Sequence, residues 1–194
     1  MTDSPGRKRR VRAFATGALA AAAFVLAGCV LTMPQPFLKE RTLESGVIPV
    51  LNGRWQDQEG AQLTFTPVKG TSNTFLAVSG KQEGSLRITL ERLDSERFIM
   101  QVVPPSDGKP QGEGQPKVSG QGVFLTIAEA SDRRVSIYTY PDTLEDIRKA
   151  AEANGVTITE NGLITKYTSA QGIVAFFRGL AAMPGHKDFV ITKK

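Results

Sequence analysis

Apolar and polar residues alternate along much of the chain between residues 53 and 140. Leu63 and Phe65 alternate with polar neighbours, and so do Ile88 and Leu90. A period of two is typical of β-strands that bury one face. Turn-forming residues separate the alternating runs, which predict seven strands: one from Gly53, and others over 62–66, 75–79, 86–91, 98–102, 123–129 and 135–140. Their short connections favour antiparallel pairing in an up-and-down meander.

The period changes after Pro141. Asp142 and Glu145 form a capping-box-like pair, which predicts a helix that ends at Asn154-Gly155. Short strands over 156–159 and 163–166 flank Asn161-Gly162, a hairpin signal.

A second helix is predicted from the next segment. Thr168 and Gln171 resemble another capping box, and Pro184-Gly185 ends the apolar pattern. Four apolar residues between them lie at helical spacing, as expected for a helix packed on a sheet: Ile173, Phe176, Phe177 and Leu180. A last strand is expected over 189–191.

We therefore expect a mainly β (α+β) fold, an antiparallel up-and-down barrel or curved sheet of about 8–10 strands with two packed helices. The inward side chains of such a barrel are expected to be Leu63, Phe65, Ile88, Leu90, Phe98, Met100, Leu125 and Ile137. The segment 104–117, rich in proline and glycine, is expected to be a long loop.

The N-terminus has the pattern of an export signal. Basic residues fill 7–12, and no charged residue occurs from Ala13 to Leu38. A basic start, an apolar run and small residues at its end are typical of a secretory signal peptide. The apolar run is also long enough for an uncleaved membrane anchor, and Arg9-Arg10 leaves export by a twin-arginine route open.

The sequence Leu26-Ala27-Gly28-Cys29 resembles the lipobox of bacterial lipoproteins. The resemblance implies cleavage between Gly28 and Cys29 and acyl chains on Cys29, which would attach the protein to a membrane. Val30 replaces the aspartate that often retains such proteins in the inner membrane, which implies an outer-membrane location facing the periplasm. The expected organisation is a signal peptide over 1–28, a lipidated tether over 29–46 and one β-rich periplasmic domain over 47–194.

The charge of the chain lies mostly in this leader. The net charge is +5, from 24 basic and 19 acidic residues, but residues 1–28 contain five of the basic residues and one of the acidic ones. The remainder therefore has a net charge of +1, which gives no reason to expect nucleic-acid binding.

Gly53-Arg54-Trp55 at the first predicted strand resembles the Gly-x-Trp motif of lipocalins. The resemblance implies an eight-stranded barrel that Trp55 closes at one end, with an arginine near it. Arg178 is the candidate for this arginine. Trp55 is equally explained as an ordinary aromatic residue of the core.

Candidate catalytic chemistry is sparse. Asp142, Glu145 and Asp146 are explained by the preference of acidic residues for the start of a helix, so no metal is expected. His186 is the only histidine, and no nucleophile-elbow sequence or phosphate-binding glycine motif occurs. We therefore expect no enzymatic activity and no cofactor.

Two functions remain as hypotheses. One is a membrane-anchored, non-enzymatic accessory module that binds a protein partner in the cell envelope. The other is a lipocalin-like carrier of a small apolar ligand, which requires a cavity of roughly 300 Å³ or more inside the barrel.

Overall fold

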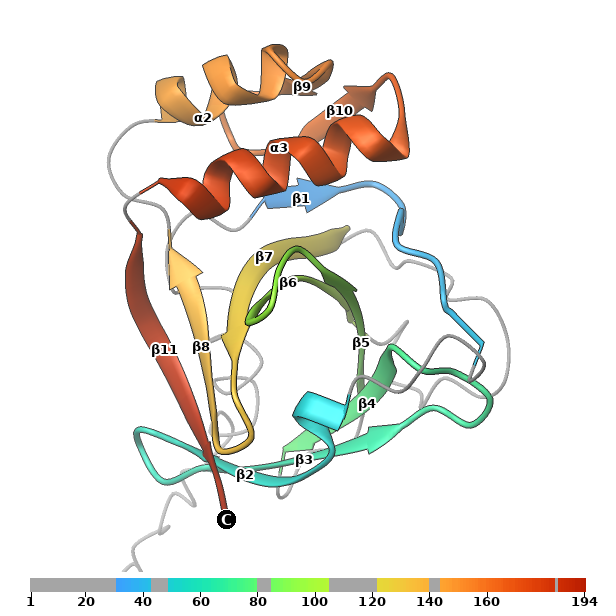
Figure 1. The fold of residues 1–194 in the computed structure, drawn as a ribbon, viewed down its shortest axis with the longest axis vertical. Coiled ribbons are helices and arrows are strands. Elements are labelled where there is room, and N and C mark those ends of the chain that lie inside the picture. The colour runs from blue at the N-terminus through green and yellow to red at the C-terminus, as the bar shows by residue number, and fades with distance from the viewer. Residues whose placement is uncertain (1–30, 43–48, 80–84, 105–121, 140–143, 184) are drawn as a thin grey trace, which may run out of the picture.

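Eight antiparallel strands close into a barrel, and two helices and a short hairpin cover one side of it (Figure 1). This is a computed structural model, and it describes residues 31–42, 49–79, 85–104, 122–139, 144–183 and 185–194. The barrel strands are β2 (Gly53–Asp57), β3 (Gln62–Pro67), β4 (Thr74–Ser79), β5 (Leu86–Arg92), β6 (Arg97–Val103), β7 (Val123–Ala130), β8 (Arg134–Thr139) and β11 (His186–Lys193). The expected fold class is confirmed, in its barrel form.

The barrel is a meander closed by the last strand. Each strand from β2 to β8 pairs with the next one along the chain. After the helices, β11 returns between β8 and β2, so that Ile191 lies opposite both Val135 and Asp57. The helical segment is thus an insertion between the last two barrel strands, and it leaves the strand order of the barrel intact.

The barrel interior is an apolar core. Side chains alternate between the two faces of each strand, and the inward ones form a continuous cluster with Leu51 from the 3-10 helix η2 (Pro49–Leu51). The largest fully buried members of this cluster are Trp55, Phe65, Phe75, Phe98, Leu51, Ile88, Leu90 and Met100.

Leu125 is a correction to the expected inward set. On β7 the side chains of Ala128 and Ala130 belong to the barrel core, so Leu125, at an odd number of positions from them, faces outward. The other seven predicted inward residues lie in the barrel core.

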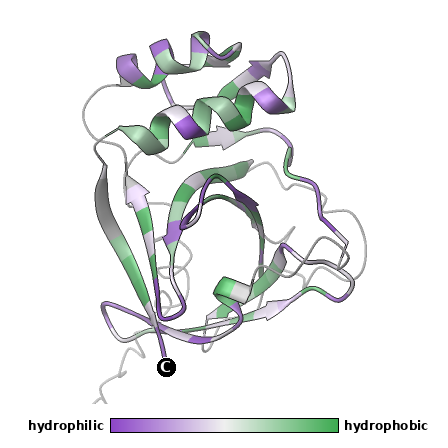
Figure 2. Cartoon of the chain, in the orientation of Figure 1, coloured by the Kyte–Doolittle hydropathy of each residue, from purple (hydrophilic) through white to green (hydrophobic). Residues whose placement is uncertain are grey.

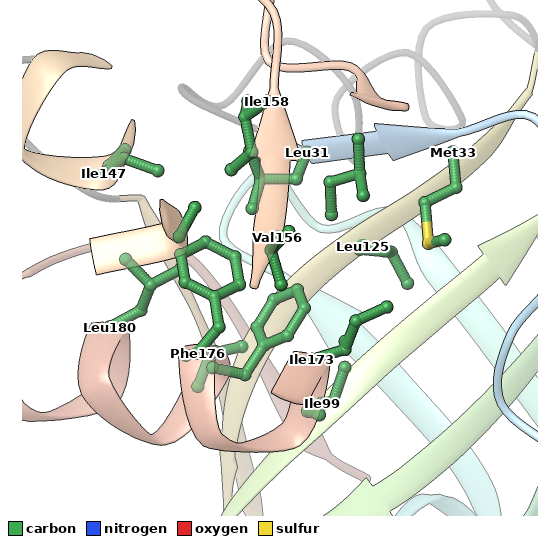
Figure 3. Close-up of a cluster of buried hydrophobic side chains, with 14 of the residues drawn as sticks. Leu31, Met33, Ile99, Leu125, Ile147, Val156, Ile158, Ile173, Phe176 and Leu180 are labelled. Atoms are coloured by element: carbon green, nitrogen blue, oxygen red, sulfur yellow. The ribbon is translucent and has the colours of Figure 1, made fainter. Parts of the chain in front are cut away.

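A second apolar core lies between the outside of the barrel and the helices (Figure 3). Ile99 and Leu125 contribute from β6 and β7, and Phe176 and Leu180 contribute from α3 (Ala170–Ala182). Other buried side chains come from α2 (Leu144–Glu152) and β9 (Val156–Ile158), which pairs with β10 (Ile164–Tyr167). The predicted packing of the helices against the sheet is therefore confirmed.

The ends of the helices agree with the sequence pattern in part. Gly155 follows α2 with a φ of +68°, as expected for a glycine that ends a helix. For α3 the capping residue is Ser169, not Thr168, and its Oγ accepts a hydrogen bond of 3.0 Å from the backbone N–H of Gly172. Helix α3 is mostly hydrophobic, with few hydrophilic residues (Figure 2), and its four predicted apolar residues are buried. Asp142 and most of the segment 104–117 lie outside the described residues.

The segment that we interpreted as a tether is partly folded into the domain. Residues Leu31–Met33 form strand β1, which pairs with the first half of β7, while β8 pairs with the second half. Leu31 and Met33 are 3% and 4% exposed and belong to the second core. The folded domain therefore includes β1 and does not begin near Val47. Burial of these two apolar side chains stabilises the segment against the barrel, which a solvated tether would not do.

Candidate functional site

Gly28 and Cys29, the residues at the predicted cleavage site, lie outside the described residues, whereas the chain from Leu31 on is held in place. Thr32 of β1 donates a 3.1 Å hydrogen bond from its N–H to the carbonyl of Gly162, in the turn between β9 and β10. It also bridges to Leu163 in parallel. Strand β1 is therefore held on one edge by β7 and on the other by this turn.

Residues 37–42, which we call the strap, are bound to the barrel by two buried amide side chains. Oε1 of Gln101 accepts hydrogen bonds from the backbone N–H groups of Phe37 and Leu38, at 2.9 and 3.0 Å. Gln101 is 1% exposed. Since a buried amide that makes hydrogen bonds holds its partners firmly, this end of the strap is fixed to β6.

Asn73 holds the other end of the strap. Its Oδ1 accepts from the N–H of Arg41 at 2.8 Å, and its Nδ2 donates to the carbonyls of Lys39 and Leu90 at 3.1 and 3.0 Å. The side chain is fully buried. All its hydrogen-bonding groups are therefore used to join the strap to β5.

Two ion pairs flank these amides. Arg41 of the strap pairs with Glu91 of β5, and Glu40 pairs with Arg87 on the same strand. These pairs are partly exposed, so they add little stability compared with the buried amides. They do fix the direction in which the strap runs across the barrel.

Trp55 lies in the barrel core with an exposure of 0%. Its Nε1 donates a 2.7 Å hydrogen bond to the carbonyl of Leu51, and the ring of Phe65 meets it edge-on with centroids 6.4 Å apart. The indole thus joins η2 to β2 and β3.

The expected neighbour of Trp55 is wrong. Arg178 is exposed on α3, on the outside of the barrel, whereas the cation over the Trp55 ring is Lys193, with its Nζ 5.7 Å from the ring centroid. The reason is that α3 packs on the outer faces of β6 and β7, while the register places Lys193 opposite Trp55. The sequence pattern could not predict this contact, because it depends on the pairing of β11 with β2, which are far apart in the sequence.

Among the described residues, the pKa is shifted for Asp94 and Lys149. Desolvation raises the pKa of Asp94. Hydrogen bonds from the backbone N–H groups of Glu96 and Arg97, together with the Arg97 guanidinium, outweigh this effect, so the pKa lies below its usual value. The hydrogen bond and charge of Glu145 raise the pKa of Lys149, four residues along α2.

The described part of the chain lacks two features. There, no three His, Cys, Asp or Glu side chains lie close enough together to hold a metal ion. Within the same ranges, no helix has the length and apolar character needed to cross a bilayer.

The carrier hypothesis places a ligand in the barrel interior. Among the described residues most of the inward-facing side chains are large and apolar, and Thr126, opposite Met100, is a buried polar exception whose hydroxyl donates to the carbonyl of Tyr138. Such a lining can contact an apolar ligand. Side chains of this size can also fill a small barrel completely, with no ligand inside.

Comparisons with protein-family models, curated proteins and solved structures found no match to this chain.

Proposed function

We propose that this protein is a bacterial envelope lipoprotein, anchored by acyl chains on Cys29, and that its barrel is a packed, non-enzymatic module that binds a protein partner. The observation that carries the proposal is the lipobox-like sequence Leu26-Ala27-Gly28-Cys29, which ends one residue before a buried strand. Only Val30 separates Cys29 from β1, and two residues of extended chain span about 7 Å.

This spacing has a mechanical consequence for the anchored protein. A lipidated Cys29 holds the domain directly at the membrane surface, because the chain after it belongs to β1 and the strap and offers no long tether. Three acyl chains supply firm attachment, since each buried CH₂ contributes about 0.8 kcal/mol. The same side of the module therefore always faces the periplasm and the partner. Val30 favours attachment to the outer membrane.

The test uses three forms of the full chain in its own host: wild type, Cys29→Ala and Val30→Asp. Wild type is expected to incorporate labelled palmitate and to lie in the outer-membrane fraction. Cys29→Ala should remain an unlabelled, uncleaved precursor in the membrane. Val30→Asp should be acylated but retained in the inner membrane. Normal cleavage of Cys29→Ala after residue 28 would contradict the lipoprotein assignment.

A lipocalin-like carrier is the second candidate, favoured by the closed eight-stranded barrel with Trp55 in its core. Ala77 distinguishes the two functions, because this small residue is 4% exposed and faces the barrel core from β4. In a packed barrel, Ala77→Leu has no room and should lower the free energy of unfolding by about 1–3 kcal/mol. In a carrier, the added side chain should enter the ligand cavity at little cost and reduce the uptake of a fluorescent fatty acid.

Val78→Leu is the matched control for this measurement. Val78 follows Ala77 on the same strand but is 40% exposed, so a leucine introduced there should change stability by less than about 0.5 kcal/mol. If Ala77→Leu is as stable as the control and wild type takes up the fatty acid, the packed module is wrong and the carrier is correct.

A further inference from the structure

Five basic residues from three separate parts of the chain come together at one end of the barrel. They belong to the beginning of β2, the turn before β8 and the end of β11, and all are exposed: Arg54, Arg133, Arg134, Lys193 and Lys194. We call them the basic end. The end of the chain marked C in Figure 1 lies here, far from β1 and the helices.

Backbone pairing fixes these residues as neighbours. The N–H of Lys194 donates to the carbonyl of Arg54 at 3.0 Å, and the N–H of Lys193 donates to the carbonyl of Arg133 at 2.9 Å. Arg134 lies opposite Thr192 in the pairing of β8 with β11. Neighbouring strands are about 4.8 Å apart, so three adjacent strand ends bring the backbones of these five residues close together, with Lys193 on the same face of the sheet as Trp55 and Arg54 on the opposite face.

None of these five cations forms an ion pair with an acidic side chain among the described residues. Asp132 is the acidic residue in the same turn, and the ion pairs between described residues involve other cations. Residues 29–194 have a net charge of only +1, so the basic end is a local concentration of charge and not a general property of the surface. Like charges on adjacent strands repel one another, which costs stability until an anionic partner binds.

One of the five cations is held in place. The chain of Lys193 passes over Gly53, whose φ of +118° suits glycine, and an added Cβ there would lie 3.3 Å from Lys193 Cε. Its ammonium group lies over the Trp55 ring, 5.7 Å from the centroid. The Gly53-Arg54-Trp55 sequence therefore builds part of the basic end: Gly53 leaves space, Trp55 positions a cation and Arg54 adds one.

We propose that the basic end is the docking surface for an acidic segment of a protein partner. Three guanidinium and two ammonium groups suit carboxylates, and arginine can bind a carboxylate through two parallel hydrogen bonds. The size favours a short peptide segment over a long polyanion. The choice of a protein over anionic lipid rests on the proposed function, because a domain anchored through Cys29 beside β1 directs the basic end away from the bilayer (Figure 1).

The experiment measures binding of a fluorescent hexaglutamate peptide to the protein extracted from its own membrane in neutral detergent, after removal of residues 1–28, with a hexaglutamine peptide as the uncharged comparison. Hexaglutamate should bind and hexaglutamine should not. Binding should weaken when salt is raised from 0.05 to 0.5 M, because exposed charges are screened beyond about 8 Å at physiological ionic strength.

Two variants with the same change of net charge locate the site. Arg133→Glu/Arg134→Glu reverses two charges of the basic end and should weaken binding of the peptide at least about tenfold. Arg148→Glu/Lys166→Glu reverses two exposed cations on α2 and β10 and should bind within about twofold of wild type. Equal effects of the two variants, or no binding of hexaglutamate by wild type, would overturn the proposal.

The lipid alternative and the anchoring are tested separately. Vesicles containing phosphatidylglycerol that bind through Arg133 and Arg134 while the peptide does not would assign the surface to lipid and overturn the proposal. Cys29→Ala keeps all five cations and also the basic leader, so reversal of Arg133 and Arg134 in this variant should still weaken binding of the peptide, over the constant contribution of the leader. A failure of the acylation experiment with intact peptide binding would therefore overturn the anchoring alone.

Discussion

At the scale of single residues, Trp55 has the greatest effect on the barrel. Its indole fills the core, and its N–H holds the carbonyl of Leu51, which otherwise lies buried at the end of η2. Trp55→Ala is expected to lower the free energy of unfolding by about 3–5 kcal/mol, through a cavity and an unpaired carbonyl. Chemical denaturation checks this value.

Arg178→Ala is the comparison for Trp55→Ala, because a lipocalin-like arrangement would make both residues part of one closure. Arg178 is exposed on α3, so its substitution should change the free energy of unfolding by less than about 0.5 kcal/mol. A large loss of stability in Arg178→Ala would contradict the placement of this side chain.

Asp94 gives the protein a small dependence of stability on pH. Its pKa is lowered in the folded state, so its stabilisation is complete above its unfolded pKa, near 4, and is lost as the pH falls through the folded value. Asp94→Asn should therefore be less stable than wild type at pH 7, by under about 1 kcal/mol for this partly exposed pair, and the difference should shrink toward pH 2. Urea denaturation across this range measures it, and parallel curves would show that Asp94 has no part in the effect.

At the scale of elements, the strap is the feature that joins the N-terminal segment to the barrel. Asn73→Ala removes the partners of Arg41 N–H, Lys39 carbonyl and Leu90 carbonyl. It should lower the free energy of unfolding by about 1–3 kcal/mol. Hydrogen exchange should also accelerate at the amide of Arg41.

Asn52→Ala is the matched control, since it makes the same change at an exposed asparagine just before β2. It should alter stability by less than about 0.5 kcal/mol and leave the exchange of the Arg41 amide unchanged. If the two variants exchange at the same rate at Arg41, Asn73 does not hold the strap.

A helix or strand can be predicted from the sequence when the pattern that produces it lies within its own residues. Strand β3 buries only one face, so its alternation can be read from the sequence, and the apolar stripe of α3 is equally local. On β7 both faces are buried, the outer one by β1 and the helices. Alternation then cannot tell which face is inside, and the interpretation of Leu125 failed for this reason.

The N-terminal segment was misread because its partners are distant. Strand β1 has three residues, too few to show a period, and Pro34 and Pro36 with nearby charges resemble a solvated tether. The amides that fix the strap lie 32 and 64 residues further along the chain, at Asn73 and Gln101. The basic end depends in the same way on the register of β11, which no local pattern contains.

At the scale of the whole molecule, two apolar cores share the wall formed by β6 and β7. The barrel core supports the basic end, and the second core holds β1 next to Cys29. In the proposed anchored protein, these features lie at opposite ends, so attachment to the membrane and docking of a partner do not compete for one surface.

The acylation of Cys29 is the central claim, and mass spectrometry of the protein extracted from its own membrane tests it most directly. The denatured mass should correspond to residues 29–194 with added acyl chains. A native mass on the same sample should include a protein partner, whereas a bound small molecule would favour the carrier. An unmodified full chain of 20.9 kDa would contradict the account.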